Sequence, residues 1–109
     1  MSPHLRFAVE DVRFDVNART ASRGGEPVSL TPTEWRLLER LAHDAGRLVL
    51  NAELLTDVWG PRHRHDVQYL RVWISRLRRK LEPHPAEQRL IKTMQGIGYM
   101  LDAKPLADS

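Results

Sequence analysis

Short runs in the first thirty residues alternate apolar and polar side chains. The segments LRFAV (residues 5–9) and DVRFDV (residues 11–16) have this period of two, which is typical of strands with one buried and one solvated face. Farther along, Gly24 and Gly25 lie between two weaker polar runs and can take the positive φ angles of a tight hairpin turn. The pattern predicts a small antiparallel sheet at the N-terminus.

A helix is predicted next, because several start signals agree. In TPTE, Thr31 is placed to act as the N-cap, Pro32 takes the first helical position, and Glu34 completes a capping box. Gly46 is predicted to end the helix. Between these limits apolar residues recur with helical spacing at Trp35, Leu38, Leu41, Ala42 and Ala45.

The same reasoning predicts two more helices. The segment NAELLTDVWG begins with Asn51 as a cap and ends at Gly60-Pro61. Its inward-facing residues are predicted to be Leu54, Leu55, Val58 and Trp59. A third helix is predicted from about Asp66 to about Leu81, before the segment EPHP.

Two further segments are predicted to be strands. RLVL (residues 47–50) is one short strand, and RLIKTMQGIGYMLD (residues 89–102) is predicted to form two strands joined by a turn with Gly96 and Gly98. The order is therefore strands, helix, short strand, helix, helix and hairpin. This order predicts an α+β fold.

The length and composition limit the class of protein. A chain of 109 residues suits one compact domain, with a core expected in residues 5–102 and frayed ends at 1–4 and 103–109. No apolar run approaches the roughly 18 residues that cross a bilayer, and we find no signal peptide at the start. Cysteine is absent from the sequence, which removes disulfides and thiolate chemistry. We expect a cytoplasmic protein without a membrane partner.

The positive charge of the chain is concentrated in one segment. Residues 62–80 hold seven basic residues and one acidic residue, a net charge of +6, whereas the other 90 residues carry ten basic and thirteen acidic groups, a net charge of −3. One fifth of the chain is thus a basic segment on a mildly acidic body. This asymmetry indicates a polyanionic partner.

The predicted third helix has two different faces. One is an apolar band, with Trp73 at its edge, formed by Val67, Leu70, Ile74, Leu77 and Leu81. The core needs that band, so this is not a membrane-surface helix. A merely solvated helix would mix acids with its bases, but no acid lies between Val67 and Leu81. The opposite face carries Gln68, Tyr69, Val72, Arg76 and Arg79.

The residues of that opposite face fit the major groove of DNA. Arg76 and Arg79 can each donate two hydrogen bonds to guanine, and Gln68 can pair with adenine. Val72 and Tyr69 can meet a thymine methyl group. We therefore predict these five residues as base contacts.

Phosphate contacts are predicted around the same face. They are the basic and polar residues of the preceding loop and of the helix flanks: Arg62, Arg64, His65, Arg71, Ser75, Arg78 and Lys80. Arg78 lies nearer the apolar band, so an ion pair with a first-helix acid such as Glu34 is an equal alternative for it.

Four motifs together resemble a known family. LTPTEWRLLERLAHDAGRLV, ELLTDVWG, ISRLRRKLE and IKTMQGIGYML are similar to the effector domain of the OmpR/PhoB family of two-component response regulators, over about Leu5 to Asp102. The run HDVQYLRVWISRLRRKLE resembles the potassium-responsive KdpE branch of that family. The resemblance implies a winged helix-turn-helix with a four-stranded N-terminal antiparallel sheet, three helices and a C-terminal β-hairpin wing.

The resemblance also implies roles for these elements. Residues 66–81 would be the recognition helix in the major groove, and residues 52–59 the positioning helix. The loop of residues 60–65 contacts RNA polymerase in some relatives, and DNA or neighbouring subunits in others. Its charge here makes a phosphate contact at least as well supported.

The hairpin tip would be the wing, which reaches the adjacent minor groove in relatives. It consists of Gln95, Gly96, Ile97 and Gly98. Many relatives carry Arg where this chain has Gln95 and Met100, so we expect weaker insertion, with Lys92 and Gln95 in contact with phosphates.

The partners that the resemblance implies are DNA and a second copy of the chain. Relatives bind direct repeats head to tail, with half-sites about one helical turn apart. A receiver domain with a phosphorylated Asp usually precedes this domain, and nothing in the 109 residues could be that domain. The chain is then either a fragment of a longer regulator or an unusual single-domain regulator. We expect the fragment, of a bacterial regulator that acts at the nucleoid.

Catalysis and metal binding find little support. His63 and His65 lack an obvious third ligand, and Arg64 between them repels a cation, so we expect no metal. Asp11 and Asp15 are predicted on a wet sheet face with no pocket, so we expect neither an enzyme nor a cofactor.

One alternative of another class stays open. A winged-helix module that binds a protein or RNA, with non-specific affinity for nucleic acid, would need exposed anchors or stacking aromatics. Tyr69 and Val72 are few for the first purpose. The candidates for stacking on RNA are Tyr99, Trp73 and Tyr69, and each has a packing explanation.

Overall fold

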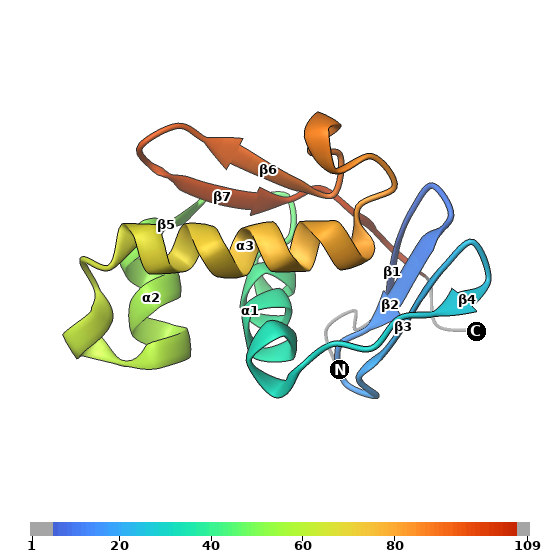
Figure 1. Ribbon diagram of the computed structural model, residues 1–109, viewed down its shortest axis with the longest axis horizontal. Coiled ribbons are helices and arrows are strands. Elements are labelled where there is room, and N and C mark those ends of the chain that lie inside the picture. The colour runs from blue at the N-terminus through green and yellow to red at the C-terminus, as the bar shows by residue number, and fades with distance from the viewer. Residues whose placement is uncertain (1–5, 107–109) are drawn as a thin grey trace.

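The computed structural model describes residues 6–106 (Figure 1). The frayed ends that we predicted at 1–4 and 107–109 lie outside these residues. The helices are α1 (Pro32–His43), α2 (Asn51–Trp59) and α3 (Val67–Leu81), with single 3₁₀ turns η1 (Pro61–His63) and η2 (Pro85–Glu87). The strands are β1 (Arg6–Val9), β2 (Val12–Asp15), β3 (Thr20–Arg23), β4 (Glu26–Pro27), β5 (Val49–Leu50), β6 (Ile91–Met94), β7 (Gly98–Leu101) and β8 (Lys104–Pro105).

The N-terminal sheet has five antiparallel strands in the order β4-β3-β2-β1-β8. Phe7 and Phe14 pair across β1 and β2 on its buried face, with ring centroids 5.3 Å apart. The fraying predicted for residues 103–106 is wrong, because β8 pairs with β1 and the Leu106 N–H donates to the Arg6 carbonyl at 2.8 Å. The tail thereby satisfies the backbone groups of what would otherwise be an open sheet edge.

Helix α1 begins as its sequence predicts. The Glu34 N–H donates to the Thr31 hydroxyl at 3.2 Å, and the Thr31 N–H donates to the Glu34 carboxylate at 2.8 Å, which is the capping box. The helix ends at His43, earlier than the predicted limit at Gly46. Gly46 instead has a φ of +83° and donates its N–H to the Leu101 carbonyl at 2.8 Å, so it closes the turn into β5.

Helix α2 begins differently from the prediction. Leu50, not Asn51, is the N-cap, because the chain passes from β5 directly into the helix. Glu53 three residues later accepts the Leu50 N–H at 3.2 Å. The strand that precedes α2 lies very close to β7: a Cβ on Gly98 would overlap the Val49 carbonyl. Only glycine therefore fits this crossing.

The arginine Arg40 ties α1 to α2. Its guanidinium donates to Asp57 at 2.7 Å and to Asp44 at 2.8 Å. The hydrogen bond from Arg40 lowers the pKa of Asp44, and the bond to Asp57 raises the pKa of Arg40. This contact fixes the helix pair against which α3 packs.

One hydrophobic core joins both sheets and all three helices. From α3 it takes Leu70, Ile74, Leu77 and Leu81, each no more than 1% exposed, whereas Val67 is only partly buried. Burial of a leucine or isoleucine stabilises the fold by about 1.5–3 kcal/mol. In Figure 1 α3 runs across the molecule, with α1 and α2 on one side and the β6–β7 hairpin on the other. Its register and its outward face are therefore fixed.

No helix in the described part of the chain is long and apolar enough to span a membrane.

Candidate nucleic-acid interface

The outward face of α3 carries a row of exposed side chains. Gln68, Val72, Ser75 and Arg79 follow each other at intervals of four, three and four residues, and Val72 at its centre is 49% exposed. Arg76 lies beside this row and is also exposed. Among the described residues, none of these polar side chains has a hydrogen bond or ion pair partner. Their donors are free to meet a ligand.

The wing-facing flank of α3 is occupied by contacts within the protein. Arg78 has only 13% of its side chain exposed, and it donates to the Ile91 carbonyl at 2.7 Å and to the Thr93 hydroxyl at 2.6 Å. Its guanidinium also lies over the Tyr99 ring, 5.8 Å from the centroid. Burial lowers the pKa of Arg78 and raises that of Tyr99. Arg78 therefore connects α3 to the hairpin through hydrogen bonds.

On the opposite flank of α3, the ion pair predicted as an alternative between Arg78 and Glu34 is wrong. Glu34 is bound by Lys80, with Nζ 2.6 Å from the carboxylate oxygen, and not by Arg78. Helical geometry explains the exchange, because Arg78 lies on the side of α3 that faces the hairpin and Lys80 on the side that faces α1. The amine of Lys80, predicted to contact a phosphate, is thus already engaged.

Aromatic rings join α2 to α3 along this second flank. The ring centroid of Trp59 lies 5.3 Å from that of Tyr69 and 6.0 Å from that of Trp73. Tyr69, predicted as a base contact, is still 45% exposed. The Arg76 guanidinium lies over the Trp73 ring, 4.9 Å from its centroid.

The loop between α2 and α3 extends the basic surface. Arg62, Arg64 and His65 are exposed, and Arg64 Nε donates to His65 Nε2 at 3.1 Å. His63 Nδ1 lies 2.9 Å from an Asp66 carboxylate oxygen, which holds the loop against the start of α3. Within residues 6–106, no three His, Asp or Glu side chains converge on a position that could hold a metal ion.

The hairpin tip lies beside the first half of α3. Gln95, Gly96 and Ile97 are exposed, whereas Gly98 is buried against β5. A hollow of about 310 Å³ separates the tip from α3 and is lined by Arg71 on the helix side and by Tyr99 of β7. The predicted wing and the wing-facing flank of α3 therefore border one hollow.

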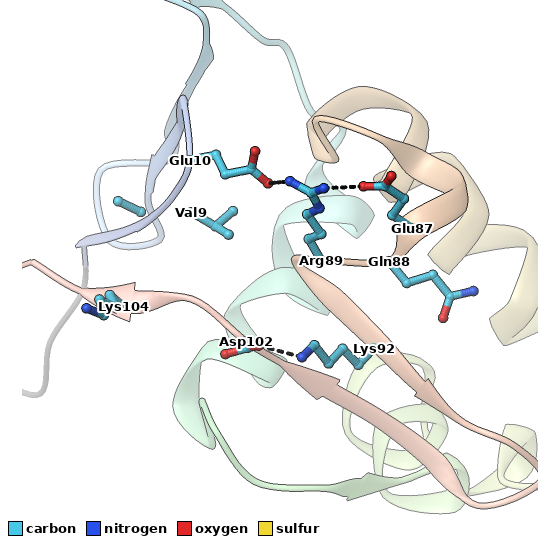
Figure 2. Close-up of a pocket in the computed structure, with 9 residues that line it drawn as sticks. Val9, Glu10, Glu87, Gln88, Arg89, Lys92, Asp102 and Lys104 are labelled. Carbon is cyan, nitrogen blue, oxygen red and sulfur yellow. Dashed lines mark hydrogen bonds and ion pairs between the residues drawn. The ribbon is translucent and has the colours of Figure 1, made fainter.

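Lys92, predicted to contact a phosphate, is not part of this basic face. Ile91 and Thr93 face α3, so alternation along β6 directs Lys92 to the other side of the hairpin. It lines a hollow of about 510 Å³ between β6 and the N-terminal sheet, and its Nζ lies 2.8 Å from the Asp102 carboxylate. Figure 2 shows this pair. In the same hollow Arg89 bridges Glu10 and Glu87 at 2.7 and 2.6 Å.

Two residues that support the site were missed in the sequence. The fully buried carboxylate of Glu82 accepts the N–H groups of Leu90 and Ile91 at 2.6 and 3.0 Å, which fixes the hairpin to the end of α3. Arg23 in β3 donates to the carbonyls of Arg79 and Glu82. The i,i+4 spacing of Arg78 and Glu82 signals only the ion pair between these two residues, at 3.9 Å. The bonds of Glu82 to the hairpin and those of Arg23 to the helix end depend on the tertiary fold.

A basic helix placed outward by a shorter helix, with a β-hairpin at its side, defines the winged helix-turn-helix class of DNA-binding domains. The profile of the family described as "Transcriptional regulatory protein, C terminal" matches residues 25–101. The chain belongs to this family, the effector domains of the OmpR/PhoB response regulators.

Relatives of known identity agree with this assignment. The chain is 44% identical over 97 residues to the KDP operon transcriptional regulatory protein KdpE of Escherichia coli K12, a match that covers 89% of this chain and 42% of the relative. It is 44% identical over 89 residues to KdpE of Mycobacterium tuberculosis, covering 82% and 39%. The chain thus spans about two fifths of the length of these curated relatives.

Solved structures share the fold. The DNA-binding domain of Klebsiella pneumoniae RstA, in complex with the RstA box, is 31% identical with a TM-score of 0.75, covering 91% of this chain and 98% of that one. The DNA-binding domain of E. coli CpxR is 32% identical with a TM-score of 0.72, covering 93% and 97%.

Proposed function

We propose that this chain binds double-stranded DNA sequence-specifically, as the effector domain of a bacterial transcriptional response regulator. The observation that carries the proposal is the free outward face of α3. This face presents two arginines, an amide, a hydroxyl and an aliphatic side chain, and no acid. Among the described residues, its polar groups have no hydrogen-bond or ion-pair partner. The RstA domain, which has the same fold, is bound to DNA in its structure.

In this proposal the exposed row reads bases in the major groove. Arg76 and Arg79 donate to guanine, Gln68 pairs with adenine, and Val72 meets a thymine methyl group, with Tyr69 as a second apolar contact. An α-helix fits the width of the major groove, and the row lies on the side of α3 opposite its buried residues.

Phosphate contacts come from Ser75 within this row and from the groups that border it. Arg62, Arg64 and His65 in the loop and Ser75 and Arg71 on the helix are placed for this role. Arg78, Lys80 and Lys92 are engaged within the protein, so their contribution requires them to exchange an internal partner for a phosphate. The tip of residues 95–98 is assigned to the adjacent minor groove, without an arginine to insert.

The finer assignments concern partners outside this chain. We assign a direct-repeat site bound by two copies head to tail, RNA polymerase as a further partner for the loop of residues 60–65, and a place at the bacterial nucleoid. The relatives are more than twice as long as this chain, and we assign to their remaining length a receiver domain that controls binding by phosphorylation.

Selection from a pool of randomised duplexes, read by sequencing at two salt concentrations, tests the proposal. Enrichment of one motif, repeated about 10–11 base pairs apart, is the expected result. Binding that depends on salt but enriches no motif would show an electrostatic clamp. The base-reading roles would then be dropped in favour of the non-specific interaction module.

A further inference from the structure

We propose that Trp73 is a positioning residue for Arg76: its indole holds the guanidinium in the orientation in which it reads a base. The inference rests on the proposed function, because it concerns how the outward face of α3 distinguishes one DNA sequence from another.

The geometry of the pair sets this role. Arg76 Cζ lies 4.9 Å from the centroid of the Trp73 ring, within the range of a cation–π contact. The donors of a guanidinium lie in its own plane and point away at its edge. A guanidinium that rests on an aromatic face therefore loses freedom of rotation without losing a hydrogen-bond donor.

The indole is itself held in place by other rings. Trp73 packs against Trp59 of α2 at 6.0 Å and against Tyr69 at 6.4 Å, and these two rings meet edge to face at 5.3 Å. The His63 ring stacks on Tyr69 at 6.3 Å and extends the cluster to the loop. The support beneath Arg76 is thus anchored on α2 and the loop as well as on α3.

Arg76 combines features that the other α3 cations of the described chain do not share. Arg78 also lies over a ring, but its donors are used by Ile91 and Thr93. Arg79 has free donors but no ring beneath it, and Lys80 is bound to Glu34. Among the described residues of α3, Arg76 alone is both fixed by a ring and free to donate.

A fixed side chain binds with a smaller loss of conformational entropy. The gain from immobilising one rotamer-rich side chain in advance corresponds to about two- to tenfold in affinity. Trp73 should therefore favour the sequence that Arg76 reads and leave contacts to other sequences unchanged.

A double-mutant cycle tests the inference, with the duplex enriched by the unaltered domain and a scrambled duplex as probes. Trp73→Leu should lower affinity for the enriched duplex about two- to tenfold and leave the scrambled duplex within about twofold. In an Arg76→Ala background, Trp73→Leu should have no further effect on the enriched duplex. Trp73→Phe, which keeps a ring face, should retain most of the affinity.

Arg79 supplies the matched control. In an Arg79→Ala background the effect of Trp73→Leu should be undiminished, because no ring supports Arg79. Full additivity with Arg76→Ala, or equal losses on both duplexes, would overturn the inference and leave Trp73 a packing residue.

A second measurement covers the case in which Trp73→Leu does not fold. In the unaltered domain, the ring current of Trp73 should shift the NMR signals of the Arg76 δ-methylene protons upfield, and unshifted signals would refute the contact. If the unaltered domain enriches no duplex, the proposed function itself fails, before any variant is made, and the inference falls with it.

Discussion

At the scale of single residues, the cations of α3 differ by what surrounds them. The amine of Lys80 binds Glu34, and the guanidinium of Arg78 donates its hydrogen bonds to Ile91 and Thr93 of the hairpin. Arg71 lines the hollow between α3 and the hairpin tip, together with Tyr99. Arg76 and Arg79 keep their donors free among the described residues. We therefore propose these two arginines as the base readers on α3.

Replacement of Arg76 by alanine should weaken binding to the selected duplex by about 1–3 kcal/mol and relax the preference at one base position. The cause is the loss of a two-bond contact to guanine. Fluorescence anisotropy with duplexes changed at each position measures both effects. An equal loss on every sequence would make Arg76 a phosphate contact.

Arg78→Ala should act on folding more than on recognition. Its removal strips the Ile91 carbonyl and the Thr93 hydroxyl of a donor in a half-buried place, so the free energy of unfolding should fall by about 1–3 kcal/mol in urea denaturation. Arg79→Ala is the matched control and should change stability by less than about 0.5 kcal/mol while it weakens DNA binding. The reverse order of stabilities would contradict this assignment.

The helical period predicts which face of α3 a residue occupies. The outward direction of the site residues could therefore be predicted from the sequence. Gln68, Val72, Arg76 and Arg79 were predicted to point outward, and they do. The helical period does not predict the partner of each cation. Arg78 and Lys80 lie on opposite flanks of the outward face, so Arg78 contacts the hairpin and Lys80 contacts Glu34 of α1. Their partners depend on the tertiary packing of α1 and β6.

At the scale of elements, the end of α3 and the start of the hairpin form one unit. The Glu82 carboxylate accepts two backbone N–H groups of the hairpin, and Arg23 caps the carbonyls at the helix end. A buried carboxylate is stable only when its oxygens are bonded in this way. The position of the wing relative to the recognition helix is set here.

Glu82→Ala should therefore destabilise the domain by about 2–5 kcal/mol, because it leaves the buried N–H groups of Leu90 and Ile91 without an acceptor. Thermal and urea denaturation measure the loss. Glu87→Ala, which removes an exposed ion pair with Arg89, should cost less than about 1 kcal/mol. Similar losses for the two variants would argue against a structural role for Glu82.

Local signals predict the existence of most elements, whereas their edges depend on neighbours. The capping box of Thr31 and Glu34 needs only four residues, and it was predicted correctly. The N-cap of α2 is Leu50 and not the predicted Asn51, because β5 leads directly into the helix. Strand β8 formed because β1 offered an open edge, and the direction of Lys92 followed from which face of β6 meets α3.

At the scale of the whole molecule, positive charge gathers along one surface. The loop cations Arg62 and Arg64 continue the basic face of α3. In the hollow beside β6, by contrast, Arg89 and Lys92 are paired with acids (Figure 2). A surface of this kind attracts a polyanion from a distance and releases its counterions on contact.

Arg62→Ala should weaken binding to all duplexes and reduce the slope of log K against log salt by about 1, since one phosphate contact is lost. Titrations at several salt concentrations measure the slope. Arg13→Ala removes the same charge from the exposed face of β2 and should leave the slope nearly unchanged. An equal change for both variants would mean that only the net charge matters.

The central claim is that the outward face of α3 reads bases in the major groove. The most direct test replaces each guanine of the selected half-site, one at a time, by 7-deazaguanine, which lacks the N7 acceptor in that groove, and measures affinity by anisotropy. At least one position should lose about 1–3 kcal/mol of binding free energy, and Arg76→Ala or Arg79→Ala should abolish the difference there. Affinity that is unchanged at every guanine would contradict arginine readout by α3.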